Sequence, residues 1–403
     1  MLTVLHPEVM HVVHDVPAGL IPFWFIGESR PTLVVKASKE ALMAAKINLG
    51  FKFYVAPVLV SGITTIGLIT AFFDDGDEPL TITTPLFADP FAEDMRTLLL
   101  GGEFAVHFYD DNNRELLGYE AKAVCSKQTH ERLTSSSLLP FDLSAARSIM
   151  DQMPLWFGLR TPADDLDAIS VEFGETLVPE DLFIQDMRPE NHSYQGSQPF
   201  SFTHLHREEP GPLQERDIVQ LLSRIFPPDQ IYLNPLRVTD KEEIADIIVI
   251  TASRVFFVQA KDSPNIERIL RQPIDRKKTA TTKALKKAAG QMRGAFRYAR
   301  SKSPMSIIVG GQTVEVSLEG LEFRALIVVK ELFMDEYSVY TPPLLNLAKE
   351  LSASCIPLDY PELHMYTRHL NDEEAFVAAW DRVFAHGVES EMFPRLRFGL
   401  IES

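Results

Sequence analysis

The sequence predicts a chain of two mixed parts: an α+β domain over residues 1–185 and an α/β domain over residues 213–403, whose mixed sheet is flanked by helices. Three observations lead to this fold class. Strand-like and helix-like segments alternate through the first half. Residues 186–212 lose that periodicity and are rich in Pro, Gly, Ser and Asn, as linkers are. Two runs beyond the linker are nearly all apolar, which is typical of strands covered on both faces.

The composition is that of an ordinary globular protein. The chain has 403 residues, of which 45% are hydrophobic and 24% charged, so it is long enough to bury more than one core. Cys125 and Cys355 have no metal-binding spacing and cannot form a disulfide framework, so we expect them to fill cores in a reducing cytoplasm. The first residues show no basic leader before an apolar segment, and export or membrane association is therefore not expected.

The first half contains two predicted hairpins and no catalytic motif. The stretch from Tyr54 to Phe73 is long enough to cross a bilayer. However, Pro57 and many β-branched residues favour two buried strands that are joined at Ser61 and Gly62. The polar sequence DDNN between two alternating runs indicates the second hairpin. We expect this half to choose a substrate, to bind a protein partner or to restrain the second half.

The second half begins with an amphipathic helix over residues 212–226, which Pro227 ends. A strongly basic helix lies further along, and a surface helix near the end of the chain is expected to be capped by Asn371 and ended by Gly387. Apolar runs predict the strands of this half over residues 231–238, 244–250, 254–260 and 322–333.

Four polar residues interrupt the apolar pattern of these elements. Gln259 and Lys261 project from one face of a strand, because side chains alternate along it. Asp246 begins the preceding strand, and antiparallel pairing carries it towards Gln259. Glu215 extends the apolar face of the first helix, which packs on the sheet. The fold is therefore expected to gather these four side chains.

Such a group of residues favours one chemistry. Carboxylate and amide oxygens bind Mg²⁺ or Mn²⁺, and a lysine beside the metal can orient water and stabilise charge on a phosphate, as in metal-assisted phosphodiester hydrolysis. Each residue also has a structural interpretation. Glu215 is favoured in the first turn of a helix, Asp246 can cap a strand, and Lys261 can be a solvated strand end.

The order of these residues resembles that of the PD-(D/E)xK nucleases, the restriction-endonuclease-like superfamily. A helical Glu215 and a strand Asp246 precede Gln259-Ala260-Lys261 at the end of the next strand. The Q-x-K form is most similar to the Mrr-like and NERD-like branches. The resemblance covers roughly residues 212–330 and leaves the first half unexplained.

The resemblance implies a restriction-endonuclease-like fold and a role for each residue. Asp246 would be the principal ligand of Mg²⁺ or Mn²⁺, with Gln259, Glu215 and the backbone carbonyl of Ala260 as further ligands. Lys261 would position the attacking water. By family analogy, the chain would act in bacterial restriction or antiphage defence.

The basic helix predicts a surface for nucleic acid. The chain as a whole carries a net charge of −17, which repels nucleic acid, but residues 268–302 contain 12 Lys and Arg and one acid. A cationic row suits a phosphate backbone without reading sequence. By the resemblance, Gln291 would lie near the scissile phosphate and Gly290 would let the backbone approach. The predicted nucleic-acid-binding residues are Lys283, Lys286, Gln291, Arg293, Arg297 and Arg300.

The sequence thus predicts a cytoplasmic, metal-dependent nuclease that acts on DNA. The alternative is a catalytically inactive module of the same fold that binds nucleic acid or a protein partner. A homo-oligomer is compatible with both hypotheses.

Overall fold

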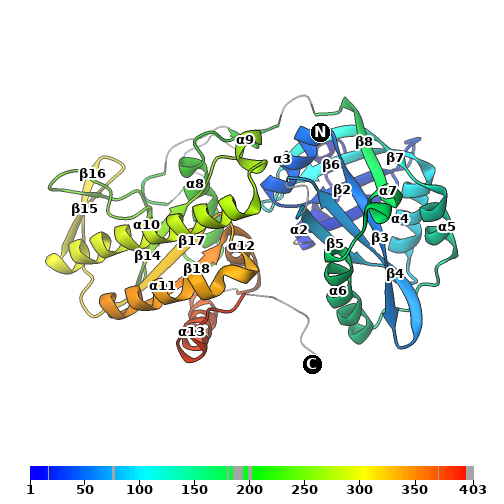
Figure 1. The fold of residues 1–403 in the computed structure, drawn as a ribbon. Helices are drawn as coiled ribbons and strands as arrows, with labels where there is room; N and C mark the ends of the chain where they lie inside the picture. The colour runs from blue at the N-terminus through cyan, green and yellow to red at the C-terminus, as the bar shows by residue number, and fades with distance from the viewer. Residues whose placement is uncertain are drawn as a thin grey trace. The chain divides into compact units, whose positions relative to one another are not determined.

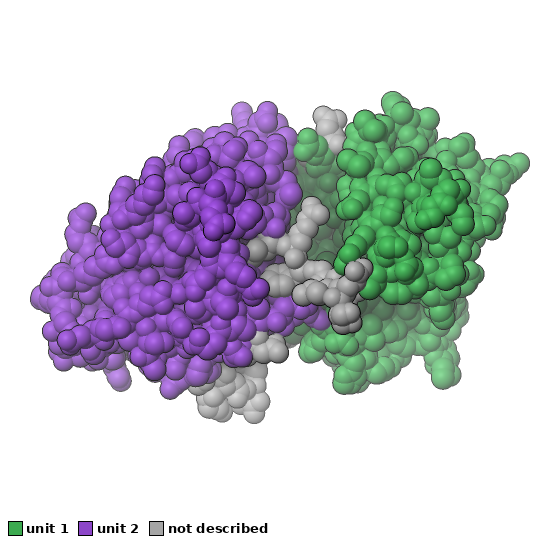
Figure 2. Space-filling view, turned by 90° about the horizontal axis from the view of Figure 1, so that it is seen from below, with its two compact units in different colours: residues 1–183, 204–207, 265–272 green, residues 184–203, 208–264, 273–403 purple. Residues whose placement is uncertain are grey.

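The structure is a computed structural model that describes residues 1–16, 18–74, 78–178, 181–184, 194–197, 202–370 and 372–395. The chain divides into two compact units, which are coloured separately in Figure 2. Each unit has a hydrophobic core of its own. Unit 1 comprises residues 1–183, 204–207 and 265–272, and unit 2 comprises residues 184–203, 208–264 and 273–403.

The described part of unit 1 is built on an eight-stranded mixed sheet. One neighbouring pair, β2 and β6, is parallel, and the other pairs are antiparallel. In spatial order the strands are β1 (Gly19–Phe23), β2 (Thr32–Lys36), β6 (Glu103–Tyr109), β7 (Glu115–Val124), β8 (Ile169–Thr176), β3 (Gly50–Val60), β4 (Ile63–Phe72) and β5 (Leu80–Pro85).

Helices cover both faces of this sheet, because its strands alternate apolar residues between the two faces. Phe53 packs in a core with α3 and α4, whereas the next residue, Tyr54, packs in a core with α6. The helices of unit 1 are α1 (Leu2–Leu5), α2 (Val9–Asp15), α3 (Lys39–Asn48), α4 (Pro90–Gly101), α5 (Lys127–Ser135), α6 (Leu143–Gly158), α7 (Pro162–Asp167) and α9 (Glu267–Leu270). Two short strands, β9 (Leu182–Ile184) and β10 (Phe202–His204), pair with each other.

Both predicted hairpins of the first half are confirmed. The stretch from Tyr54 to Phe73 forms most of β3 and all of β4, and Val60 pairs with Ile63 across the turn. Ser61 and Gly62 have φ of 50° and 84°, the left-handed conformation of a two-residue hairpin turn. The second hairpin joins β6 and β7. Within the described ranges, no helix is both long enough and apolar enough to span a bilayer.

Unit 2 contains a five-stranded mixed sheet in which β14, β17 and β18 are parallel and β11 and β13 complete the order by antiparallel pairing. The strands are β11 (Ile231–Leu233), β13 (Ile247–Ile250), β14 (Arg254–Lys261), β17 (Glu322–Val329) and β18 (Ser354–Asp359). A separate three-stranded sheet consists of β12 (Leu236–Arg237), β15 (Met305–Val309) and β16 (Gln312–Val316).

Two consecutive residues of β14 show how helices cover both faces of this sheet. The ring centroid of Phe257 lies 4.9 Å from that of Phe296 on α10, whereas that of Phe256 lies 5.8 Å from Trp380 on α13. Figure 1 shows α10 and α11 running along one face. The helices are α8 (Gly211–Leu222), α10 (Ile274–Ser301), α11 (Tyr337–Leu351), α12 (Tyr360–His369) and α13 (Glu373–Ser390), with the 3₁₀ turns η2 (Pro228–Gln230) and η3 (Met334–Glu336).

The mixed α/β character with helix-flanked sheets is confirmed, but two element boundaries were wrong. The predicted strand 231–238 is divided into β11 and β12, because Asn234 has φ of 47° and Pro235 has no N–H to donate. The last helix does not end at Gly387, which is buried within α13. Asn371 lies outside the described residues, and Asp372 caps this helix instead.

Candidate functional site

Three of the four predicted residues lie at the carboxyl end of β14. Gln259 and Lys261 are both on β14, and Gln259 is buried. Asp246 lies directly before β13 and is also buried. The antiparallel pairing of Ile247 with Val258 places Asp246 beside Gln259, as the hairpin prediction required.

These residues form one hydrogen-bonded cluster around the Lys261 ammonium. Its Nζ lies 3.2 Å from Asp246 Oδ2, 3.4 Å from Gln259 Oε1 and 2.6 Å from the Ala260 carbonyl oxygen. The same Asp246 oxygen accepts a hydrogen bond from the Ala260 backbone N–H. The ammonium therefore compensates the negative charge of Asp246 in this structure.

Glu215 joins the cluster through a residue that the sequence prediction did not include. On α8, its Oε2 accepts a hydrogen bond of 3.0 Å from Asn234 Nδ2. The backbone N–H of Asn234 in turn donates to the Asp246 carbonyl oxygen over 2.9 Å. Burial raises the pKa of Glu215 and the charge of Asp246 raises it further, while Asn234 and Lys261 oppose the shift.

Glu243 is a second residue that the prediction missed. It lies in the loop before β13, and its carboxyl group shares a hydrogen bond with Asp246. The residue is exposed as a whole, yet burial of the carboxyl group raises its pKa well above the ordinary value. The hydrogen bond to Asp246 and the charges of Asp246 and Glu215 act in the same direction. Three acids therefore influence one another here, of which the sequence pattern indicated two.

The oxygen atoms of the cluster are of the kind that Mg²⁺ and Mn²⁺ prefer. The donors are the carboxylates of Glu215, Glu243 and Asp246, the amide oxygen of Gln259 and the carbonyl of Ala260.

Two observations fit a cation at this position. Burial is the main cause of the raised pKa values of Glu215 and Glu243, and the charge of Asp246 raises both further; Asn234 Oδ1 is buried without a hydrogen-bond partner. The geometry is not that of a closed site, since no three His, Cys, Asp or Glu side chains in the described ranges stand close enough to hold a metal together. Metal binding would require the carboxylates to approach one another and the Lys261 ammonium to withdraw from Asp246.

A hollow of about 250 Å³ adjoins Glu215. Glu215 and Asn234 line it together with Arg216 of α8 and Gly310 of the β15–β16 turn. The hollow gives solvent and small ligands access to Glu215, and the Arg216 guanidinium adds a positive charge to its wall.

The basic helix α10 has the two faces that the sequence predicted. The apolar stripe from Leu285 to Ala299 is buried against the sheet. The predicted nucleic-acid-binding residues are all exposed, namely Lys283, Lys286, Gln291, Arg293, Arg297 and Arg300, and Gly290 is exposed beside them.

The row of cations from Lys283 to Arg300 is, however, spread over about 26 Å of α10. Thr281 donates a hydrogen bond to the Glu331 carbonyl just beyond the carboxyl end of β17, the edge at which Lys261 lies. Arg300 instead lies over the ring of Phe323, at the start of β17. Lys283 is therefore near the edge that carries the acids, and Arg300 lies at the opposite edge.

Two of the predicted arginines also have intramolecular partners. Arg293 Nε lies 2.5 Å from Glu350 Oε2 on α11. The Arg300 guanidinium stands 5.3 Å and 5.1 Å from the ring centroids of Phe296 and Phe323. Arg293 is thus less available to a phosphate backbone than Lys283 and Lys286.

The fold brings the four predicted residues into one region of unit 2, and Asn234 and Glu243 connect them. Their order along the elements is the predicted one: an acid on α8, an acid before β13, and an amide and an ammonium on β14. No known relative assigns them a role, because comparisons of the chain with protein-family models, with curated proteins and with solved structures find no match.

Proposed function

We propose that unit 2 is a restriction-endonuclease-like nuclease of the PD-(D/E)xK type, which hydrolyses phosphodiester bonds in DNA with Mg²⁺ or Mn²⁺. One observation supports this most directly. The Lys261 ammonium contacts both the Asp246 carboxylate and the Gln259 amide at the carboxyl end of a buried strand, and Glu215 lies within electrostatic range of Asp246.

Each residue would have a defined part in the reaction. Asp246, Gln259 and Glu215 would hold the metal, and the Glu243 carboxyl would lose its proton to join them. When bound, the ion would activate water and stabilise charge on the phosphate. Lys261, released from Asp246, would orient the attacking water and neutralise a phosphate oxygen. Lys283 and Lys286 would hold the DNA backbone on the same side of unit 2.

A second candidate function is a catalytically inactive module that binds nucleic acid or a protein partner. Two observations favour it. The charge of Asp246 is already compensated by Lys261, and Gln259 supplies a neutral amide where a carboxylate would bind a metal more strongly. In either case, unit 1 would select the substrate or a partner, and a cytoplasmic defence role would rest on fold analogy alone.

The decisive experiment is a cleavage assay with the purified full-length chain. Plasmid and single-stranded DNA are incubated with Mg²⁺, Mn²⁺ or EDTA, using wild type, Asp246→Ala, Lys261→Ala and the exposed-lysine control Lys302→Ala. We expect metal-dependent cleavage that falls about 10²-fold or more in the two site variants and is unchanged in the control.

The variants need a folding check, because removing Lys261 leaves the buried Asp246 carboxylate unpaired. Circular dichroism and thermal unfolding of each variant provide it, and Lys261→Met retains most of the apolar stem if Lys261→Ala proves unstable. DNA binding without cleavage in any metal supports the inactive module. Cleavage that persists in folded Asp246→Ala contradicts the proposed site.

A further inference from the structure

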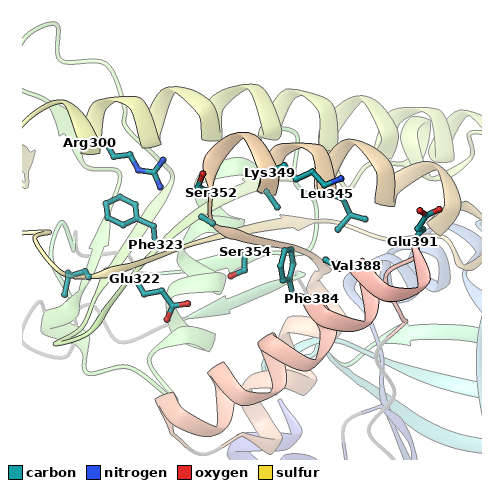
Figure 3. A pocket seen from close by; sticks show the side chains of 13 residues that line it. Arg300, Glu322, Phe323, Leu345, Lys349, Ser352, Ser354, Phe384, Val388 and Glu391 are labelled. Atoms are coloured by element: carbon teal, nitrogen blue, oxygen red, sulfur yellow. The ribbon is translucent and has the colours of Figure 1, made fainter.

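A second hollow in unit 2 is distant from the acids. Its volume is about 650 Å³, and it lies between α10, α11, α13 and the first residues of β17 and β18 (Figure 3). Glu322 and Ser354 begin these two parallel strands, so the hollow is at the edge opposite to Lys261. Its volume is within the range of pockets that bind small organic molecules, about 300 to 1,000 Å³.

The floor of this pocket is apolar. Phe323, Leu345 and Phe384 are partly buried against the core of unit 2 and expose their remaining surface to the pocket. Val388 on α13 completes the floor and is 51% exposed. Rings from two different elements, β17 and α13, thus offer contact area to a flat or ring-bearing ligand.

Two cations line the same pocket without a carboxylate partner among the described residues: Arg300 and Lys349. The Arg300 guanidinium is held over Phe323, which fixes its plane. A smaller hollow of about 260 Å³ adjoins at Arg300 and is also lined by Arg297. A planar guanidinium presents parallel N–H donors that suit a carboxylate or a phosphate.

Among the described residues, neither acid that lines the pocket forms an ion pair with Arg300. Glu322 lies 2.7 Å from Arg324 and 3.6 Å from Arg254, two arginines that also pair with Asp381, Glu373 and Glu374. Glu391 also lines the pocket, but Figure 3 shows it at the end away from Arg300. The positive end of the pocket is therefore the one that Arg300 and Ser352 line.

We propose that this pocket binds a small organic anion, in which a carboxylate or phosphate group on a ring-bearing body is held by Arg300, the ring lies on Phe323 and Phe384, and the Lys349 ammonium adds positive charge further along the pocket. The inference does not depend on nuclease activity, because none of these residues is near Lys261 and the test below measures binding alone. It also gives Arg300 a role other than the one predicted for it in the cationic row of α10.

The probe is 1-anilinonaphthalene-8-sulfonate, a fluorescent anion on aromatic rings, titrated into the folded full-length chain. The variants are Arg300→Gln and Val388→Asp, with Arg276→Gln as control, since Arg276 is an exposed arginine at the other end of α10. Val388→Asp changes an exposed residue, so it keeps the test valid if Arg300→Gln fails to fold. We expect the wild type to bind the dye saturably and Arg300→Gln to weaken the dye affinity about 10- to 100-fold. Val388→Asp should also weaken the affinity, and Arg276→Gln should leave it unchanged.

Competition distinguishes the possible ligands. Displacement by adenosine monophosphate, but not by adenosine or inorganic phosphate, assigns the pocket to phosphate esters, whereas displacement by 1-naphthoate assigns it to aromatic carboxylates. Asp246→Ala is expected to bind the dye as wild type does. Absence of saturable binding, displacement by none of these anions, or equal affinity in wild type, Arg300→Gln and Val388→Asp would overturn the proposal.

Discussion

Glu115 shows how a single buried carboxylate can fix a chain segment. Its side chain is fully buried on β7. The two carboxylate oxygens accept hydrogen bonds from the backbone N–H groups of Leu2 and Thr3 over 2.8 Å and 2.9 Å, and His107 Nδ1 lies 3.0 Å away. Glu115 therefore satisfies N–H groups at the start of α1, which have no partner within the helix.

The same contacts predict a pH dependence of stability. Burial by itself raises the pKa of Glu115, but the hydrogen bonds from His107, Thr3 and Leu2 outweigh it and lower the pKa from 4.5 to about 2. A lowered pKa in the folded state stabilises the fold above pH 4.5, and this stabilisation is lost as the pH falls towards 2. The shift corresponds to about 3 kcal/mol.

Denaturant unfolding of wild type and Glu115→Gln between pH 2 and pH 7 measures this contribution. We expect the wild type to be more stable at neutral pH and the difference to shrink steadily as the pH falls from about 5 to 2. Parallel profiles for the two proteins would show that the carboxylate charge of Glu115 does not stabilise the fold.

At this scale, local rules predicted part of the candidate site and could not predict the rest. Strand alternation placed Gln259 and Lys261 on one face, and hairpin register brought Asp246 beside them. Asn234 was assigned to a strand interior, because its left-handed φ is not visible in the sequence. Glu243 was missed because it lies in a loop, where no periodicity fixes the direction of a side chain.

At the scale of elements, Gly387 was predicted to end a helix. It instead lies within α13, where its lack of a side chain allows the ring of Phe393 to pack against the helix. A Cβ added to it would lie 2.6 Å from two ring atoms of Phe393, which is itself buried. Glycine also costs a helix interior about 1 kcal/mol relative to alanine. The two effects of a Gly387→Ala substitution therefore oppose each other.

We expect the clash to dominate and Gly387→Ala to lower the free energy of unfolding, because overpacking costs about 1 to 3 kcal/mol. Gly290→Ala is the matched control: it is also inside a helix, but its Cβ would meet nothing within 4 Å, so it should stabilise by about 1 kcal/mol. Thermal and denaturant unfolding of both variants test this. If Gly387→Ala is stabilising as well, Phe393 does not pack on α13 as described.

The cations of α10 allow a second prediction at this scale, which depends on the proposed DNA binding. For about five phosphate contacts with duplex DNA, the logarithm of the affinity should fall with the logarithm of the salt concentration with a slope of about −4 to −5. Lys283→Ala and Lys286→Ala should each make the slope shallower by about one. Arg293→Ala should change it less, because Glu350 already pairs with Arg293.

Fluorescence anisotropy with a short labelled duplex at several salt concentrations measures these slopes. A slope near zero in wild type would exclude the phosphate contacts altogether. An effect of Arg293→Ala equal to that of Lys286→Ala would show that the ion pair with Glu350 opens on binding, and that the row acts over its whole length.

At the scale of the whole molecule, the sequence predicted two parts but not how the chain contributes to them. Residues 265–272 belong to unit 1 although they follow β14 of unit 2. Asn265 exchanges backbone hydrogen bonds with Arg207, over 2.8 Å and 3.3 Å, and its side chain donates to the Leu205 and Lys39 carbonyls. Such contacts join residues that are distant in sequence, so a scan for linker composition does not detect them.

Two separate cores predict two separable unfolding transitions, because core residues of one unit stabilise that unit alone. Phe104 in unit 1 and Phe257 in unit 2 are fully buried, and truncation of either to alanine should cost about 3 to 5 kcal/mol. We expect each variant to lower the transition of its own unit and the double variant to show the sum of the two effects.

The distribution of tryptophan makes this measurable in the intact chain. Of the three tryptophans, Trp24 and Trp156 belong to unit 1 and Trp380 belongs to unit 2. In a Trp380→Phe background, tryptophan fluorescence therefore reports on unit 1 alone. Circular dichroism follows the unfolding of both units. In that background Phe104→Ala should shift the fluorescence transition, whereas Phe257→Ala should shift only part of the dichroism signal. The contrary outcome is a single unfolding transition, seen with both probes, that the two substitutions shift equally. It would mean that the two cores unfold as one cooperative structure, so that the two units are separate in geometry but not in stability.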